Sequence, residues 1–309
     1  MLNAAQIAAR QKGLGGSDAG CIVGINPYRG CLGVWSRFHV PGWNDDEEET
    51  EASEAGNLFE DAIATRYAKL EGVELAKVEQ TIVSPRFPFM IANPDRLIVG
   101  RPKGLEVKTT GLRVAHRWGD EETDTIPDEY RLQCDHYMAV LEVDEWDLTV
   151  CIGGQDFRTY RLKRDLEREE LLIAAEQEFW NRYVVTGEQP PIAGPDAGEF
   201  VKRIYPRALF PDADTTPEMI EAAMEFAELR EAAKQAEERK EDAATRLKAM
   251  LGQFAGFRWG EKGKVSWTNN KDGTAIGWEP IARELGASKE LIEKYTTTKP
   301  GARVLCVTV

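Results

Sequence analysis

The stretch "GLEVKTTG", residues 104–111, places a glutamate and a lysine two positions apart in a segment that otherwise has the composition of a strand. Successive side chains of a strand point to opposite faces. We therefore expect Glu106 and Lys108 on one face and Leu105 and Val107 on the other. Taken alone, the charged pair fits the exposed face of an edge strand, where an ion pair contributes at most about 1 kcal/mol. The surrounding sequence has to decide between that interpretation and a functional site.

A second carboxylate precedes this stretch in "NPDRLIVG", residues 93–100. Asp95 lies eleven residues before Glu106 in another predicted strand, and "GRPKG" between them predicts a turn. The resulting hairpin would bring both carboxylates close enough to share a hard cation such as Mg²⁺. Such an ion polarises a phosphodiester and helps to form hydroxide from water, and a second ion can bind about 3.5 to 4 Å away. Lys108 would orient or deprotonate the attacking water and neutralise developing charge.

The first 190 residues alternate between helical and extended patterns. Helices are predicted at residues 17–24, 31–38, 57–72 and 127–143, and from 165 to about 183. Strands are predicted at residues 77–84, 89–99, 103–110, 145–153 and 156–162, with a turn at Gly153 and Gly154 joining the last two. This order predicts an α/β (α+β) core, in which helices flank a central mixed sheet.

The composition predicts three parts: a core of residues 1–190, a linker of residues 191–216, and a C-terminal part of residues 217–309. The stretch from Pro190 to Pro217 contains six prolines and no sustained periodicity, which is typical of a linker. The charged segment that follows predicts one long helix or two packed helices, then a hairpin at residues 257–268 and a last strand at residues 303–309. We expect this part to serve oligomerisation or partner binding rather than catalysis.

Several functional classes are disfavoured by composition. The 309 residues include no apolar run long enough for a membrane span and no N-terminal signal peptide, so a cytoplasmic protein without a membrane partner is expected. Five scattered cysteines without a CxxC pair predict reduced thiols and neither a disulfide framework nor a zinc or iron-sulfur site. Three histidines without an HxxxH pattern argue against a histidine metal site.

The net charge of −14 argues at face value against a nucleic-acid partner. The charges are unevenly distributed, however. Much of the acidic excess lies at residues 44–54 and after Pro217, whereas residues 86–117 contain seven Lys and Arg against only Asp95 and Glu106. The paired carboxylate and lysine therefore lie inside a basic zone.

Four other residues have both an ordinary structural interpretation and a functional one. Glu60 follows Asn57 by three residues, as in a capping box, but it also borders an apolar helix face where an inward carboxylate would need a cation or a donor. Gln133 and Tyr137 lie one helical turn apart and fit simple packing at the edge of the core. Ser17 fits an N-cap, and a helix N-terminus is also a phosphate site.

Together these motifs resemble a nuclease family. "PD" at residues 94–95 with "EVK" at 106–108 resembles the PD-(D/E)xK signature, and "QCDHY" at 133–137 resembles the helical QxxxY motif of RecB-like nucleases. The stretch "RQKGLGGSDAGCIVGINPY", residues 10–28, resembles the N-terminal motif of the YqaJ and lambda exonuclease family of phage recombination nucleases. The resemblance implies a restriction-endonuclease-like fold for the nuclease core, residues 1–190, and fades after about Pro191.

The resemblance also implies residue roles and cofactors. Mg²⁺ is the expected metal, as one or two ions, with Mn²⁺ as the alternative. The cysteine spacing of iron-sulfur relatives and the ATP-binding motif GxxxxGK[ST] are both lacking, so neither an iron-sulfur cluster nor ATP is expected. The implied metal ligands are Glu60, Asp95, Glu106 and a backbone carbonyl near Val107. Lys108 would position and activate water, Gln133 and Tyr137 would orient the site, and Arg10 and Ser17 would hold a 5′-terminal phosphate.

The function implied is a 5′ to 3′ exonuclease that resects linear double-stranded DNA for phage-type recombination. Its relatives imply a homo-oligomer, such as a trimeric ring around DNA, and a single-strand annealing protein as partner in the bacterial host cytoplasm. An endonuclease of the same fold remains an alternative, and Arg10 and Ser17 are the residues that distinguish the two. A non-catalytic DNA-binding assembly protein is a third possibility, which the intact Asp95, Glu106 and Lys108 set disfavours.

Overall fold

The computed structural model describes residues 4–43, 50–121, 123–210, 212–260, 263–268, 285–286 and 288. The chain divides into two compact units, residues 1–204 and 205–309.

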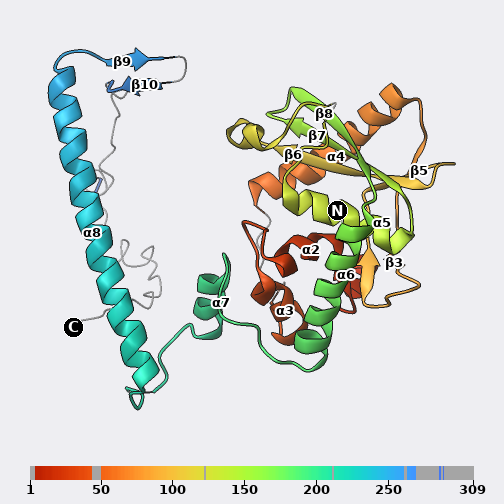
Figure 1. The fold of residues 1–309 in the computed structure, drawn as a ribbon, viewed down its shortest axis with the longest axis horizontal. Helices are drawn as coiled ribbons and strands as arrows, with labels where there is room; N and C mark the ends of the chain where they lie inside the picture. Colours follow the sequence, from red (N-terminus) through yellow and green to blue (C-terminus); the bar gives the residue numbers. More distant parts are fainter. Residues whose placement is uncertain are drawn as a thin grey trace. The chain divides into compact units, whose positions relative to one another are not determined.

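A five-stranded mixed sheet forms the centre of the first unit (Figure 1). In spatial order its strands are β2 (Leu75–Ala76), β5 (Arg96–Ile98), β6 (Lys103–Thr110), β7 (Glu145–Ile152) and β8 (Asp156–Lys163). β6 and β7 are parallel, and the other neighbouring strands are antiparallel. A parallel pair requires a crossover connection, and the helix α5 (Asp128–Leu141) lies in it.

The remaining elements of this unit are mostly helices. They are α1 (Ala4–Arg10), α2 (Gly16–Val23), α3 (Cys31–His39), α4 (Glu51–Glu71), the 3₁₀ turn η1 (Leu112–Arg117), α6 (Leu166–Phe179), the π-helical η2 (Trp180–Val185) and α7 (Ala197–Ile204). A second small sheet has the order β1 (Leu14–Gly15), β4 (Met90–Ala92) and β3 (Ile82–Val83). β1 leads directly into α2, so its pairing with β4 determines where that helix begins.

Helices cover both faces of the large sheet. On one face, Ile63 and Tyr67 of α4 pack with Leu105 and Val107 of β6. On the other, α5 contributes Tyr137 and Met138 to a core that contains Trp146 and Leu148 of β7. The alternation expected in β6 is therefore confirmed, and so is the mixed α/β fold. Because Glu106 is only 2% exposed on the α5 face, the surface ion pair considered above is excluded.

Two helix starts differ from the sequence interpretation. α4 begins six residues before Asn57 and is capped by Thr50, whose side chain accepts the Ser53 N–H, so Asn57 and Glu60 form no capping box. α2 has Gly15 as its N-cap, not Ser17. The cap interaction is instead the Gly15 N–H donating to Asp18 Oδ2 at 2.8 Å, because β1 runs into the helix without an intervening turn.

Part of the expected linker, residues 191–216, is structured. Residues 197–204 form α7, whose Phe200 is 2% exposed and packs against Trp35 and Trp43 with ring centroids 6.4 and 5.8 Å away. The helix is too short to show periodicity among the flanking prolines, so its burial depends on aromatic contacts that are distant in sequence. Residues 197–204 thus belong to the first unit.

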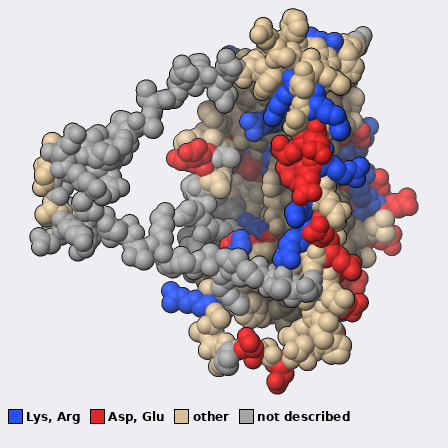
Figure 2. Space-filling view, turned by 90° about the vertical axis from the view of Figure 1, so that its left-hand side faces the viewer, with Lys and Arg blue, Asp and Glu red and all other residues tan. Residues whose placement is uncertain are grey.

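The second unit contains one long helix, α8 (Pro217–Leu251), capped by Thr216. β9 (Gly256–Trp259) and β10 (Gly263–Ser266) follow as the predicted antiparallel hairpin. Acidic and basic side chains are interspersed on the face of the molecule shown in Figure 2. The strand predicted at residues 303–309 lies outside the described residues. None of the helices in the described part of the chain is long and apolar enough to cross a membrane.

Candidate active site

A cavity of about 180 Å³ lies beside β6, at the first turn of α2 and the buried face of α5. Seven of the residues predicted for the site line it: Arg10, Ser17, Asp95, Glu106, Lys108, Gln133 and Tyr137. They come from five regions of the chain, which the fold brings together around one space.

The two carboxylates meet through the β5–β6 hairpin. Arg96 pairs with Leu105 in its antiparallel register, and Asp95 Oδ2 accepts the Val107 N–H at 2.7 Å. The predicted hairpin is confirmed, but Asp95 lies one residue before β5 rather than inside a strand. The long strand expected at residues 89–99 is broken because β4 and β5 pair in different sheets and the chain turns between them.

Glu106 accepts two side-chain hydrogen bonds in the cavity. Its Oε1 accepts hydrogen bonds from Lys108 Nζ at 2.6 Å and from Gln133 Nε2 at 2.7 Å. Its Oε2 is buried and has no hydrogen-bond partner among the described residues. Lys108 Nζ also lies 4.9 Å from the centroid of the Tyr130 ring, a cation–π contact that sequence analysis did not anticipate.

The QxxxY motif is hydrogen-bonded to this carboxylate through Gln133. Gln133 Nε2 donates to the Tyr137 hydroxyl at 3.1 Å as well as to Glu106, and the Tyr137 hydroxyl donates to the carbonyl of Asn93 at 3.4 Å. α5 is thereby linked both to β6 and to the segment that carries Asp95. Simple packing at the edge of the core does not account for this chain of polar contacts.

Burial and mutual repulsion make the site electrostatically strained. Burial, together with Glu106 and Glu60, raises the pKa of Asp95 well above its usual range. Burial also raises the pKa of Glu106, although Lys108 opposes it. Burial by itself would lower the pKa of Lys108, but Glu106 and Asp95 outweigh it and raise that pKa. The two carboxylates therefore favour the ammonium form of Lys108, and its role towards water stays a prediction.

Asp95 and Glu106 fit a divalent cation. When both are ionised, these two adjacent buried carboxylates carry more negative charge than the single nearby lysine neutralises, and Glu106 Oε2 has no hydrogen-bond partner among the described residues. Oxygen donors of this kind are the ligands that Mg²⁺ prefers. Val107 contacts the site through its N–H, so a role for its carbonyl stays a prediction.

Glu60 is placed differently from the other predicted ligands. It lines a neighbouring cavity of about 240 Å³ that shares Asn93 and Asp95 with the first, and its Oε1 accepts from Arg96 Nη1 at 2.7 Å. In the described ranges, no three His, Cys, Asp or Glu side chains are gathered as a ready-made metal centre. Glu60 nevertheless acts electrostatically on both Asp95 and Glu106, and its role as a metal ligand stays a prediction. Arg96 was missed by sequence analysis, although it directly follows Asp95.

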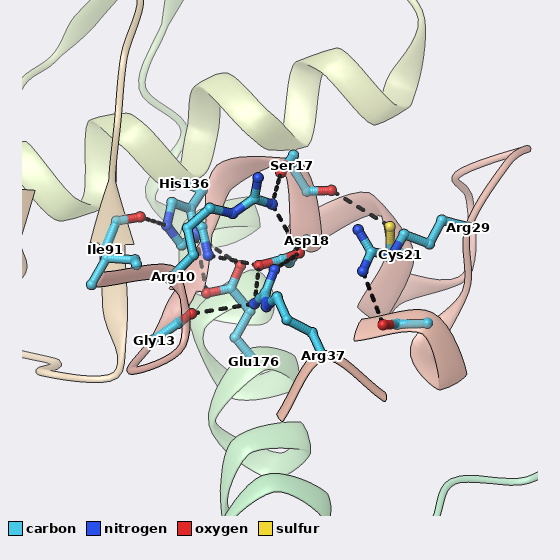
Figure 3. Close-up of polar contacts among 12 residues, drawn as sticks. Arg10, Gly13, Ser17, Asp18, Cys21, Arg29, Arg37, Ile91, His136 and Glu176 are labelled. Atoms are coloured by element: carbon cyan, nitrogen blue, oxygen red, sulfur yellow. Dashed lines mark hydrogen bonds and ion pairs between the residues drawn. The ribbon is translucent and has the colours of Figure 1, made fainter. Parts of the chain in front are cut away.

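The predicted phosphate-binding pair lies at the start of α2. Arg10 Nη2 donates to Ser17 Oγ at 3.0 Å, and Ser17 is exposed in the first turn of the helix (Figure 3). Free N–H groups at a helix N-terminus together with a guanidinium group suit an anion. Behind this pair, Asp18 forms two hydrogen bonds with Arg37, a residue nineteen positions away that had no recognisable local signal.

The fold and the cavity define an α/β protein with a paired-carboxylate and lysine site. Residues 7–144 match the family model of the YqaJ-like viral recombinase domain. The "Uncharacterized protein YqaJ" of Bacillus subtilis (strain 168) is 36% identical over 201 residues, which cover 63% of this chain. The match spans 61% of that relative's own length.

Solved structures with a similar chain path include two exonucleases. An alkaline exonuclease (LHK-Exo) from Laribacter hongkongensis has 17% sequence identity and a TM-score of 0.47, over 64% of this chain and 95% of that chain. A phage related exonuclease from Haemophilus somnus 129PT has 14% identity and a TM-score of 0.43, over 57% of this chain and 96% of that chain.

Proposed function

We propose that this protein is a metal-dependent exodeoxyribonuclease that degrades linear double-stranded DNA from its 5′ ends. The observation that carries the proposal is the single cavity that Arg10 and Ser17 share with Asp95, Glu106 and Lys108. A terminal phosphate held at Arg10 and Ser17 would direct a neighbouring phosphodiester towards the two carboxylates. The match of residues 7–144 to the YqaJ-like viral recombinase domain supports a role in recombination.

Asp95 and Glu106 would hold Mg²⁺, or alternatively Mn²⁺, as one or two ions. When bound, the ion polarises the phosphoryl group and favours ionisation of the attacking water. Gln133 and Tyr137 keep the Glu106 carboxylate oriented towards the cavity. The ammonium group of Lys108 orients water and offsets negative charge that develops on the phosphate.

The wider setting of the activity is also a proposal. The resemblance to phage recombination nucleases supports a homo-oligomer, for which a trimeric ring is the model, and a single-strand annealing protein as partner. It also supports action in the bacterial cytoplasm. A ring would let the basic zone at residues 86–117 line a DNA channel while the acidic residues face solvent.

Three DNA substrates test the proposal in the presence of Mg²⁺: a linear duplex with 5′-phosphates, the same duplex with 5′-hydroxyls, and a closed circle. The expected order of cleavage rates is phosphate above hydroxyl, with the circle intact. Cleavage of the circle would instead identify an endonuclease of the same fold. Lys108→Ala should reduce cleavage at least about 100-fold, and an unchanged rate would show that the site is wrong.

A further inference from the structure

We infer that Arg37 is a positioning residue for the 5′ end of DNA: by neutralising the buried Asp18, it leaves the charge of Arg10 available to the terminal phosphate. The inference rests on the proposed exonuclease function. Neither Asp18 nor Arg37 lines the cavity, so their effect must be transmitted through Arg10 and Ser17.

Asp18 and Arg37 form a closed ion pair. Arg37 Nη1 donates to Asp18 Oδ1 at 2.9 Å and Nη2 donates to Oδ2 at 2.8 Å, so both carboxylate oxygens are taken by one guanidinium group. The side chains are 1% and 2% exposed for Asp18 and Arg37, respectively. Solvent therefore screens this pair little, and neither partner is replaceable by water.

Arg10 lies near the same carboxylate but forms no hydrogen bond with it. Its Nη2 lies 3.8 Å from Asp18 Oδ1, beyond hydrogen-bond distance, and donates instead to Ser17 Oγ at 3.0 Å. Its side chain is 27% exposed and borders the cavity. Figure 3 shows the two arginines reaching Asp18 from different elements, Arg10 from α1 and Arg37 from α3.

Among Asp18, Arg37 and Arg10, one carboxylate and two guanidinium groups leave one positive charge in excess. Because Arg37 occupies both oxygens of Asp18, that excess charge is on Arg10, next to the cavity. Without Arg37, Asp18 would be a buried unpaired carboxylate, and the nearest described cation is Arg10. Arg10 would then shift towards Asp18, and the terminal phosphate would have to compete for it.

A purely structural role makes a different prediction. Asp18 Oδ2 also accepts the Gly15 N–H at 2.8 Å, and Arg37 Nη2 contacts the Gly13 carbonyl at 3.3 Å, so the pair also braces the backbone before α2. Loss of bracing alone would slow cleavage of every DNA end equally. Loss of a charge reserved for phosphate would slow cleavage of phosphorylated ends selectively.

The test uses the full-length protein and the ratio of Mg²⁺-dependent cleavage rates on 5′-phosphate and 5′-hydroxyl linear duplexes. Arg37→Met should lower this ratio by about tenfold. Asp18→Asn/Arg37→Met removes both buried charges, frees Arg10 again and should restore the wild-type ratio. Arg37→Gln, which keeps a hydrogen bond to Asp18 without the charge, should also lower the ratio and replaces Arg37→Met if that variant does not fold.

The matched control is Arg164→Met, which breaks another bidentate arginine–carboxylate pair, with Glu169, at residues that do not line the cavity. Its ratio should equal that of the wild type. An unchanged ratio in both single Arg37 variants, or no recovery in the double variant, overturns the inference while leaving the proposed function intact. A wild-type protein that cleaves neither linear duplex overturns the proposed function, and the inference with it.

Discussion

Replacing Gln133 by Met tests whether the QxxxY motif acts through Glu106. Gln133 is 8% exposed, and its amide links the Glu106 carboxylate, at 2.7 Å, to the Tyr137 hydroxyl, at 3.1 Å. Methionine has a similar shape and no donor, so it retains most of the packing while removing both hydrogen bonds. Glu106 would then be oriented by Lys108 alone.

The magnitude follows from the charge on Glu106. A hydrogen bond to a charged group contributes about 1.5 to 3 kcal/mol, and each 1.4 kcal/mol in the activation free energy changes a rate about tenfold. If the bond serves to hold Glu106 in its productive orientation, Gln133→Met should lower kcat/KM by about 10- to 150-fold. The loss should persist at saturating Mg²⁺, because added metal does not replace the missing donor.

The assay is steady-state cleavage of a 5′-phosphorylated linear duplex across a Mg²⁺ titration, with thermal unfolding measured in parallel. Asp135→Asn is the matched control on α5, since Asp135 is 3% exposed and accepts a charged hydrogen bond from Arg168 Nε at 2.6 Å. This control should lower the melting temperature without lowering kcat/KM. Wild-type kcat/KM in Gln133→Met would refute the assignment of an orienting role to the motif.

Three further predictions concern stability. Asp95→Asn should raise the melting temperature of the metal-free protein at pH 7, because burial and Glu106 raise the pKa of this carboxyl and its charge is therefore unfavourable in the folded state. The same variant should abolish stabilisation by Mg²⁺, because it removes a proposed ligand. A melting temperature below that of the wild type would contradict the first expectation. The pKa of His136 is raised because the effect of Glu176 outweighs that of burial, and burial raises the pKa of Glu176. Both groups therefore bind protons more tightly in the folded state than in the unfolded state. The free energy of unfolding that this pair contributes decreases as pH rises. Urea unfolding between about pH 6 and 8 should show this decrease, with a shallower slope in His136→Gln. Gly16→Ala would place a Cβ 2.7 Å from Tyr137 Cε1 and 3.0 Å from the Gln133 carbonyl, and should cost about 1 to 3 kcal/mol in chemical denaturation; wild-type stability would show that α2 can shift freely.

Local sequence was sufficient for most of the elements and for much of the site. Side-chain alternation in a strand is a property of the backbone, so the shared face of Glu106 and Lys108 followed from their spacing. The same holds for Gln133 and Tyr137, one turn apart on a helix, and for the turn that returns Asp95 to Glu106. The roles of these residues as metal ligands or catalytic groups remain predictions.

Packing between distant segments decided the rest. From sequence alone, β6 could be an exposed edge strand or a buried strand. Glu106 is a buried carboxylate because α4 packs on one face of the sheet and α5 packs on the other. Burial in turn produced the raised pKa values of Asp95 and Glu106, since the cost of removing charge from water depends on the whole surrounding structure.

The charge partners were likewise invisible in the sequence. Arg96 holds Glu60 across 36 positions, and Arg37 holds Asp18 across 19 positions. The sequence around an arginine does not predict its ion-pair partner, because an ion pair requires only that two side chains lie close together in the folded protein. Sequence therefore determined which residues this protein presents at the cavity, whereas the tertiary structure determined which charges are neutralised there and which remain available for a ligand.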